Sequence, residues 1–529
     1  METSEQLFRG LEKLNDIGAS LSSERNLNRL LEKILLAAKT ITHADGGTLY
    51  LVSEDRRHLH FEIVRTDSLN IAFGGTSGEP ISSKFADLPL YREDGSPNNS
   101  MVAAYAALTG RTVNIEDAYS AEGFDFSGTR KFDAGTGYRS RSFLTVPMRN
   151  HEGEIIGVLQ LINATAPDSN HVVPFPEADR RLAESLASQA AIALTNRRLI
   201  QQMEDLFESF IKLINTAIDE KSPYTGGHCH RVPVLTMLLA EAVNDTTEGP
   251  LADFKLTDKD RYELRIAALL HDCGKVTTPV HVVDKATKLQ TLFDRIALVD
   301  TRFEVLKRDA EIAMLRAVAA GAERGQAEQG FREFVARCDA DRAFLRGANI
   351  GGERMSDEDI ARVQRIGNEY RWRNVDGEES AFLSANELEN LTIRAGTLTQ
   401  AEREIINHHI VATIKMLEQL PWPKHLKNVP EYAGGHHERM DGKGYPRGLK
   451  REEMSWQARM MGIADIFEAL TAKDRPYKQG MKLSQALSIL ENFCRNGHVD
   501  QDLFKVFMSS KVYAQYADDF LNDEQVDVS

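Results

Sequence analysis

The sequence has few cysteines and no long apolar run, and each absence excludes a class of protein. Four cysteines in 529 residues are too few for the disulfide framework of a small secreted scaffold, and the chain shows no signal-peptide pattern. No apolar stretch approaches the roughly 18 residues that a membrane-spanning helix needs. These absences predict a protein of the reducing cytoplasm with no membrane partner.

The chain also lacks an excess of basic residues. Its 64 lysines and arginines are outnumbered by 79 aspartates and glutamates, so the net charge is −15 at pH 7. Proteins that follow the phosphates of a polynucleotide usually present a basic surface, and we therefore expect no polymeric nucleic acid partner. A small anionic ligand needs only a local basic pocket. The length is sufficient for two or three hydrophobic cores.

The second half of the chain contains an ordered series of nitrogen and oxygen donors. These donors are His228, His271, Asp272, His409, His436, His437 and Asp465. None is a thiolate, and imidazole with carboxylate suits an open catalytic site for iron or manganese better than a structural zinc site. A carboxylate next to a histidine can serve two metals, which makes Asp272 the candidate bridging ligand.

The sequence around these donors is more specific than the donor types. AALLHDCGKV is an apolar helical run that brings a histidine, an aspartate and Lys275 toward one pocket, whereas GGHHERMDGKGYPRGL contains glycines and a proline that force a shaped loop. With GGHCHRV before them and ARMMGIADIFEALTAKDRPYK after them, these segments resemble the HD-GYP phosphodiesterases, a branch of the HD-domain metal phosphohydrolases. The resemblance spans roughly residues 211–507, with one interruption.

The resemblance implies an enzyme that hydrolyses cyclic di-GMP to linear pGpG, and further to GMP in some cases, by attack of a metal-bridging hydroxide. Two metals roughly 3.5–4 Å apart can activate the water and neutralise the charge that develops on the phosphate. The family pattern groups His228, His271 and Asp465 around one metal and His409, His436 and His437 around the other, with Asp272 between them. Relatives with a third metal carry a glutamate where this chain has Tyr224, which favours two metals.

Some assignments within this pattern remain open. His408 and His409 are adjacent, and the position of the following apolar pair favours His409 as the ligand. His436 and His437 would point about 100° apart on a regular helix, so they can share a metal only at a helix end. Glu438 and Asp441 are candidate orienters of this histidine pair.

The resemblance also assigns contacts to the substrate. Lys275 and, from the other side, Arg475 and Lys478 correspond to residues that bind the substrate phosphates. Tyr445 either stacks on a guanine or shapes its loop. The catalytic residues expected from the pattern are His271, Asp272 and Lys275.

Three alternatives compete with a cyclic di-GMP phosphodiesterase. A mixed cyclic GMP-AMP ring is the nearest competing substrate, because nothing in the motif identifies the base. A nucleotide-sensing adaptor could bind a diguanylate cyclase or another partner through the loop that contains Gly444, Tyr445 and Pro446, here called the GYP loop. Hydrolysis of mononucleotide phosphates is the third, and the extended donor set disfavours it. Because the donor set is complete, it favours an enzyme over an adaptor.

The first half of the chain predicts an antiparallel sheet flanked by helices. Strand-like runs occupy residues 46–52, 58–64, 142–148 and 154–163, and the last two are joined by a polar hairpin signal. The segment Val113–Met148 resembles a GAF domain of cyclic-nucleotide phosphodiesterases and cyclases. The signature of that family is met at Asn163, Phe175 and Asp179 but not at Ala164 and Arg180, so the domain either binds a cyclic nucleotide or serves as a dimerisation scaffold.

A helix is expected to connect the two halves. Apolar residues recur there at alternating spacings of four and three, at Leu199, Met203, Leu206, Phe210, Leu213 and Ala217. This heptad seam predicts a parallel homodimeric coiled coil; the alternative is a single helix packed on the catalytic domain. In such a dimer the rigid helix would transmit a change in the GAF domain to the active site.

An insertion interrupts the HD-GYP pattern. The segment from His281 to Leu420 contains no proline, and apolar residues from Leu292 to Ala317 again alternate four and three, which predicts a long helix followed by further helices and turns. The resulting domain prediction is an N-terminal helix at 1–25, a GAF domain at 26–197, a connecting helix at 198–222, an all-α HD-GYP domain at 223–515 with a helical insertion at 290–396, and an acidic tail at 516–529.

Overall fold

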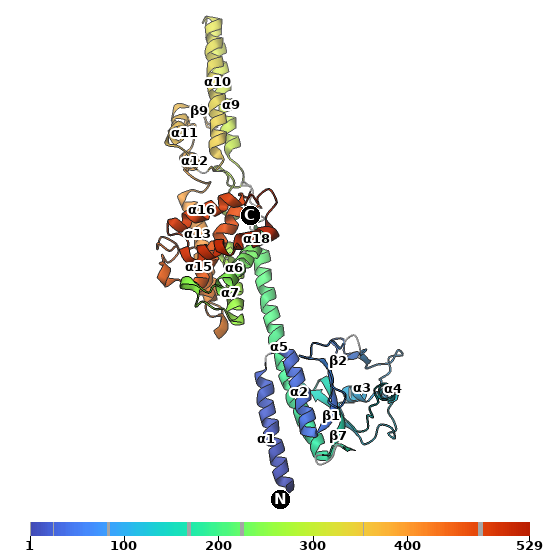
Figure 1. The fold of residues 1–529 in the computed structure, drawn as a ribbon. Coiled ribbons are helices and arrows are strands. Elements are labelled where there is room, and N and C mark those ends of the chain that lie inside the picture. The colour runs from blue at the N-terminus through green and yellow to red at the C-terminus, as the bar shows by residue number, and fades with distance from the viewer. Residues whose placement is uncertain are drawn as a thin grey trace. The chain divides into compact units, whose positions relative to one another are not determined.

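The computed structural model describes residues 2–24, 26–81, 85–166, 171–222, 227–352, 354–473 and 480–528. The chain divides into two compact units, residues 1–207 and 208–529. Helix α5 (Glu177–Lys221) runs without a break from the first unit into the second (Figure 1). No helix of the described residues is long and apolar enough to cross a membrane.

The first unit is built on an antiparallel sheet with the strand order β3-β2-β1-β7-β6-β5. Its strands are β1 Ala44–Val52, β2 His58–Thr66, β3 Ile71–Gly74, β4 Leu88–Pro89, β5 Val113–Ile115, β6 Phe143–Arg149, β7 Ile155–Thr165 and β8 Val172–Val173. The polar connection between β6 and β7 forms the predicted hairpin, because Asn150 accepts hydrogen bonds from the backbone N–H groups of Glu152 and Glu154. The long central strands β1 and β7 pair along most of their lengths.

Helices cover both faces of this sheet. The helices of the unit are α1 Glu2–Ser23, α2 Leu27–Thr42, α3 Val102–Thr109, α4 Ser127–Thr136 and the first part of α5. Buried residues of α1, α2 and α5 form one core with the sheet, and α3 packs on the opposite face (Figure 1). The predicted fold class of this half is confirmed.

Two residues of the partial GAF signature have structural roles. Asn163, at φ 56°, accepts a hydrogen bond from the backbone N–H of Arg141 and donates one to the carbonyl of Arg139, so it fixes the chain that leads into β6. Phe175 is buried in the core beneath α5. These contacts account for both residues without a ligand.

The second unit is mostly helical, as the sequence predicts. Outside the insertion it contains α6 His228–Asn244, α7 Asp258–Leu270, α8 Val280–Val283, α13 Gln400–Glu418, α14 Val429–Gly434, α15 Trp456–Thr471, α16 Leu483–Arg495, α17 Gln501–Ser509 and α18 Val512–Phe520. Short 3₁₀ helices lie between them, η1 Gly249–Leu251, η2 Cys273–Thr277, η3 Lys424–Leu426 and η4 Arg451–Glu453. Helix α18 includes the first residues of the predicted acidic tail, and Gln525 beyond it binds the carbonyls of Thr471 and Met481.

The insertion has its own hydrophobic core. It contains α9 Ile296–Ala319, α10 Arg324–Asn349, α11 Asp357–Glu369 and α12 Ala385–Leu391, and a hairpin of β9 Arg371–Arg373 and β10 Glu379–Ala381 that the sequence did not predict. Helices α9 and α10 lie side by side (Figure 1). Helix α9 begins one turn later than the periodicity predicts: Asp294 accepts a hydrogen bond from the N–H of Ile296, and Leu292 is 94% exposed.

The apolar seam of α5 is exposed. Leu199, Met203, Leu206, Phe210 and Leu213 each keep more than half of their surface accessible. Ile211 and Ile218, on another face of the helix, are buried. A helix packed only on the second unit of its own chain would bury its apolar seam, so these exposures favour the dimeric alternative, which remains a prediction.

Candidate metal centre

The predicted metal ligands come from five segments that converge in the second unit. His228 is the first residue of α6, His271 is the C-cap of α7 and Asp272 follows it. His409 lies within α13, and Asp465 lies within α15. The pair His436 and His437 follows the end of α14. All except the half-buried His437 are buried.

The donor atoms form two groups. His228, His271 and Asp272 each offer one donor atom within 4.8 Å of the others, and so do His409, His436 and His437. The Nε2 of His228 lies 3.0 Å from Asp272 Oδ2 and 3.1 Å from Asp465 Oδ1, which places Asp465 beside the first group.

Asp272 lies between the two groups. Its Oδ2 is 3.2 Å from His271 Nε2, and its Oδ1 is 3.2 Å from His409 Nε2. One oxygen therefore faces each group, which is the geometry that a bridging carboxylate requires. The neighbouring His408 is exposed, so of the two adjacent histidines only His409 reaches the centre.

The orientation of most histidines is fixed by the backbone. The Nδ1 atoms of His271 and His436 donate to the carbonyls of Ala268 and Ala433 at 2.7 and 2.6 Å, and His409 donates in the same way to Ile406. A carbonyl can only accept, so each ring carries its proton on Nδ1 and points an Nε2 lone pair into the centre.

The adjacent histidines avoid the 100° divergence of a helix because α14 ends at Gly434. Their ring centroids lie 4.3 Å apart. The ring of His437 is also stacked on that of Tyr445, with centroids 4.9 Å apart and planes 18° from parallel. Tyr445 thus supports a predicted ligand from the GYP loop.

Three buried ligand atoms in the centre, each able to accept a hydrogen bond, have no hydrogen-bond partner among the described residues. They are Asp272 Oδ1, His409 Nε2 and His436 Nε2. A buried acceptor without a donor costs about 1–3 kcal/mol, and three such atoms converge here. A divalent cation would satisfy all three, so the residues present fit the metal site that the donor types predict.

Electrostatics keep most of the ligands in the state that binds metal. Burial alone would raise the pKa of Asp272, but Lys275 and the imidazoles hold it well below its usual range. Burial lowers the pKa of His437 to about 4 and holds that of His436 well below its usual range. His228 differs, because Glu468 overcomes burial and raises its pKa.

The predicted substrate contacts are only partly described. Lys275 lies at the edge of the centre with its Nζ 2.5 Å from Asp272 Oδ2. Arg475 and Lys478 lie outside the described residues, as does Tyr224, on which the choice of two metals over three depends.

Glu438 and Asp441 do not orient the histidine pair as predicted. Glu438 accepts hydrogen bonds from the backbone N–H groups of Arg447 and Leu449 at 2.7 and 2.9 Å, and Asp441 pairs with Arg439. Both residues therefore hold the loop that carries Tyr445. Sequence reasoning also missed Glu468, a fully buried carboxylate that contacts His228.

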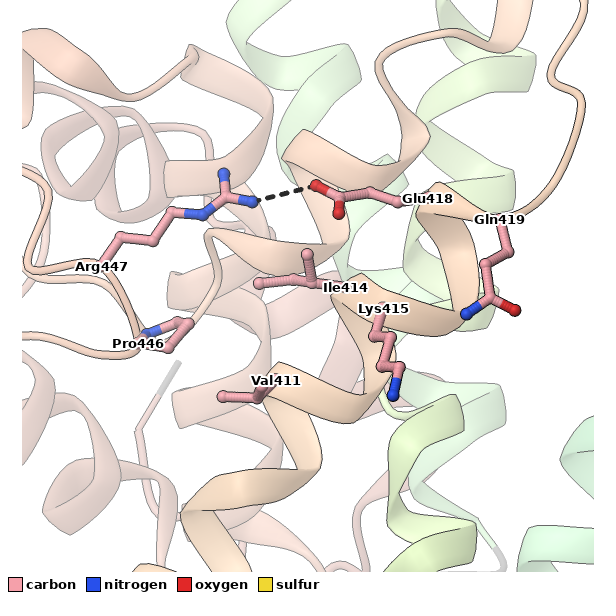
Figure 2. Close-up of a pocket in the computed structure, with 7 residues that line it drawn as sticks. All are labelled: Val411, Ile414, Lys415, Glu418, Gln419, Pro446 and Arg447. Carbon is pink, nitrogen blue, oxygen red and sulfur yellow. Dashed lines mark hydrogen bonds and ion pairs between the residues drawn. The ribbon is translucent and has the colours of Figure 1, made fainter.

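A pocket of about 580 Å³ lies between the GYP loop and α13. Figure 2 shows its lining, with Val411, Ile414, Lys415, Glu418 and Gln419 on the helix and Pro446 and Arg447 on the loop. The guanidinium of Arg447 pairs with Glu418 at 3.2 Å. None of the predicted metal ligands lines this pocket.

Known protein-family models match parts of both units of the chain. Residues 26–194 match the GAF domain, and residues 225–341 and 383–503 match two family models described as HD domain. The chain is a GAF domain followed by an HD domain. The family resemblance of the sequence is thereby confirmed, and the gap between the two HD matches lies within the predicted insertion.

Curated proteins similar to this chain include cyclic dinucleotide phosphodiesterases. The 3′3′-cGAMP-specific phosphodiesterase 3 of Vibrio cholerae is 26% identical over 54% of this chain and 36% of its own length. The 3′3′-cGAMP-specific phosphodiesterase 1 of the same organism is 35% identical over 24% of this chain and 29% of its own. A cyclic di-GMP phosphodiesterase of Pseudomonas aeruginosa is 35% identical over 22% and 27%. The matched part thus spans about a third of these relatives or less.

Proposed function

We propose that this protein is a metal-dependent phosphodiesterase that hydrolyses cyclic di-GMP to linear pGpG, and on to GMP, under control of its GAF domain. The observation that carries the proposal is the position of Asp272, whose two oxygens face the two separate donor groups. The curated relatives support a cyclic dinucleotide as the substrate class.

The residues around the metal centre have different roles in the proposed reaction. When bound, a pair of divalent cations supplies Lewis acidity, which lowers the pKa of water and neutralises charge on the phosphate. Asp272 holds both donor groups in register, and the backbone carbonyls behind His271 and His436 keep their Nε2 lone pairs aimed inward. The ammonium of Lys275 lies at the edge of the centre, where it can bind a phosphate oxygen.

Lys275→Ala should raise KM for cyclic di-GMP by about tenfold or more, since a hydrogen bond to a charged group contributes about 1.5–3 kcal/mol. Steady-state kinetics with a saturating metal supply would measure it. Lys427→Ala, a variant outside the centre, should leave KM unchanged. An unchanged KM in Lys275→Ala would show that this ammonium does not bind substrate.

The base preference can be tested by competition. Cyclic di-GMP and 3′3′-cGAMP should both be supplied to the metal-loaded full chain, with products separated by chromatography. The proposal expects faster conversion of cyclic di-GMP to pGpG. Faster conversion of the mixed ring would make this a cGAMP phosphodiesterase, as the names of two relatives suggest.

The proposed enzyme works as a homodimer joined along α5. Phe210→Asp should convert it to a monomer, because the exposed apolar seam at Phe210 would then carry a charge. Light scattering coupled to size-exclusion chromatography measures the mass. Lys212→Asp, two residues away and also exposed, is the matched control and should remain dimeric. A wild-type monomer would contradict the dimer.

The GAF domain is proposed to bind a cyclic nucleotide that regulates hydrolysis. A thermal-shift screen of the full chain with cyclic GMP and cyclic AMP tests this, since a ligand that binds only the folded state raises the melting temperature. If neither nucleotide shifts melting or changes the rate of hydrolysis, the domain acts as a dimerisation scaffold.

The pocket of Figure 2 favours a second candidate, an adaptor that binds a diguanylate cyclase or another protein through the GYP loop. Its walls join the loop to α13 outside the metal centre, and Val411 is exposed there. Val411→Glu should abolish such binding without affecting hydrolysis. A protein that binds metal but cleaves neither cyclic dinucleotide would favour this candidate over the enzyme.

A further inference from the structure

Glu468 is a carboxylate that contacts the predicted ligand His228 on the side of its ring away from the metal centre. It lies one helical turn after Asp465 on α15, and its side chain is completely buried. Its Oε2 accepts a hydrogen bond from His228 Nδ1 at 2.5 Å. Its Oε1 accepts a hydrogen bond from Arg231 Nε at 2.8 Å and forms an ion pair with Arg231 Nη2 at 2.7 Å. Both oxygens of the carboxylate are thus engaged.

The need for this contact follows from the place of His228 in its helix. His271, His409 and His436 donate their Nδ1 protons to carbonyls three residues earlier in the chain. His228 is the first residue of α6, so no preceding turn of that helix offers a carbonyl. The side chain of Glu468, 240 residues away in the sequence, provides the acceptor instead.

A carboxylate differs from a carbonyl in its charge. A histidine that donates its second ring proton to a carboxylate becomes a more basic ligand and is held in one orientation. Arg231 pairs with the other oxygen of Glu468 and fixes the carboxylate in place. The effect reaches only the first donor group, because His228 belongs to that group.

The two donor groups therefore differ in negative charge. The first has Asp272 and Asp465 beside its histidines, with Glu468 behind His228. The second consists of histidines, and the one carboxylate contact within 4 Å that the described residues show for them is that of His409 with Asp272. Asp465 acts on His436 and His437 from farther away. Arg231 and Lys275 offset the charges of Glu468 and Asp272 in part. The carboxylate of Asp465, 3.1 Å from His228 Nε2, still attracts a divalent cation more strongly to the first group.

We propose that Glu468 is a positioning residue that holds His228 with its Nε2 toward the metal and makes the first donor group the tighter of the two metal positions. This inference deepens the proposed function, on whose two metal positions it rests. The ligand in question is a divalent cation, and Mn²⁺ serves as the probe.

The test is a calorimetric titration of the chelator-treated full chain with Mn²⁺. Wild type is expected to bind two ions with different affinities. Glu468→Gln should weaken the tighter ion by about ten- to a hundredfold and leave the weaker ion unchanged. Glu263→Gln is the matched control, because Glu263 is also buried in this unit but accepts its hydrogen bonds from Asn428; both affinities should stay at the wild-type values.

The ratio of the two affinities separates positioning from a general structural role. Loss of packing alone would lower thermal stability or weaken both ions together, and either result without a change of the ratio would overturn the inference. Two wild-type affinities in Glu468→Gln would also overturn it while leaving the proposed function standing. A wild type that binds a single ion, still weakened by Glu468→Gln, would instead contradict the proposed dinuclear function.

A second measurement applies if Glu468→Gln fails to fold. Nitrogen-15 NMR of histidine-labelled wild type loaded with Zn²⁺ reports which ring nitrogen carries the proton. The inference expects His228 to be protonated at Nδ1 and bound to metal through Nε2. The opposite assignment would overturn it.

Discussion

Asp272→Asn is expected to lower the rate of cyclic di-GMP hydrolysis by about a thousandfold or more. Asp272 is the one predicted ligand whose two oxygens face both donor groups, so its loss affects both metal positions. Cations that act as Lewis acids contribute several kcal/mol to a phosphoryl-transfer barrier, and each 1.36 kcal/mol changes the rate tenfold. Asparagine preserves the volume and removes the charge.

The loss should appear in metal content as well as in rate. Asp272 carries a negative charge at neutral pH, since Lys275 and the imidazoles hold its pKa well below the usual range. Asparagine cannot provide that charge, so elemental analysis after gel filtration should find fewer metal ions than in wild type. An Asp272→Asn variant with full activity would exclude Asp272 as the bridging ligand.

Asp341→Asn is the matched control for this experiment. Asp341 is a buried aspartate of the insertion that accepts hydrogen bonds from the hydroxyl of Tyr370 and from Arg362. Its replacement also removes one buried negative charge, but far from the predicted ligands in the chain and in a separate core. Hydrolysis by this variant should stay within about twofold of wild type, because substitutions outside the site act mainly on stability.

Gly274→Ala is expected to destabilise the catalytic unit by about 3 kcal/mol or more, the upper end of the cost of overpacking. A Cβ at this position would lie 2.0 Å from the carbonyl oxygen of His409 and 2.5 Å from the backbone nitrogen of Thr413. Both are backbone atoms of α13 and cannot move aside as a flexible side chain would. The hydrogen bond from Gly274 N–H to Thr413 Oγ1 would be lost as well.

The damage from Gly274→Ala should extend to the metal centre. Gly274 lies in η2, between Asp272 and Lys275, and the methyl group would push this segment away from the helix that carries His409. Chemical unfolding and metal analysis should therefore change together. Gly330→Ala in α10 is the control, because a Cβ there meets nothing within 4 Å. It should stabilise the chain by about 0.5–1 kcal/mol. Wild-type stability and metal content in Gly274→Ala would contradict this account of η2.

The sequence predicted the fold well where local pattern determines structure. Strand-like apolar runs identified the main strands of the sheet, and spacings of four and three identified the core face of α9, where Val299, Phe303 and Leu306 are buried. The β9-β10 hairpin was not predicted from the sequence, because its strands have only three residues each. Such short strands depend on the core around them more than on their own sequence.

The predicted ligands converge in the structure, but the residues that support them could not be foreseen. His409 faces the centre because it lies on the buried side of α13, while His408 is exposed. Glu438 holds the GYP loop rather than the histidines, since the backbone N–H groups of the returning chain lie closer to it. Glu468 was missed because its partners are more than two hundred residues away in the sequence.

The central claim is that two metal ions held around Asp272 act together on a cyclic dinucleotide. The most direct test measures cyclic di-GMP hydrolysis by the metal-free chain as Mn²⁺ is added in known equivalents. We expect little activity up to one bound ion and a rise to a plateau at two, because the two donor groups are separate and share one carboxylate. Full activity with one ion, or none with two, would contradict the claim.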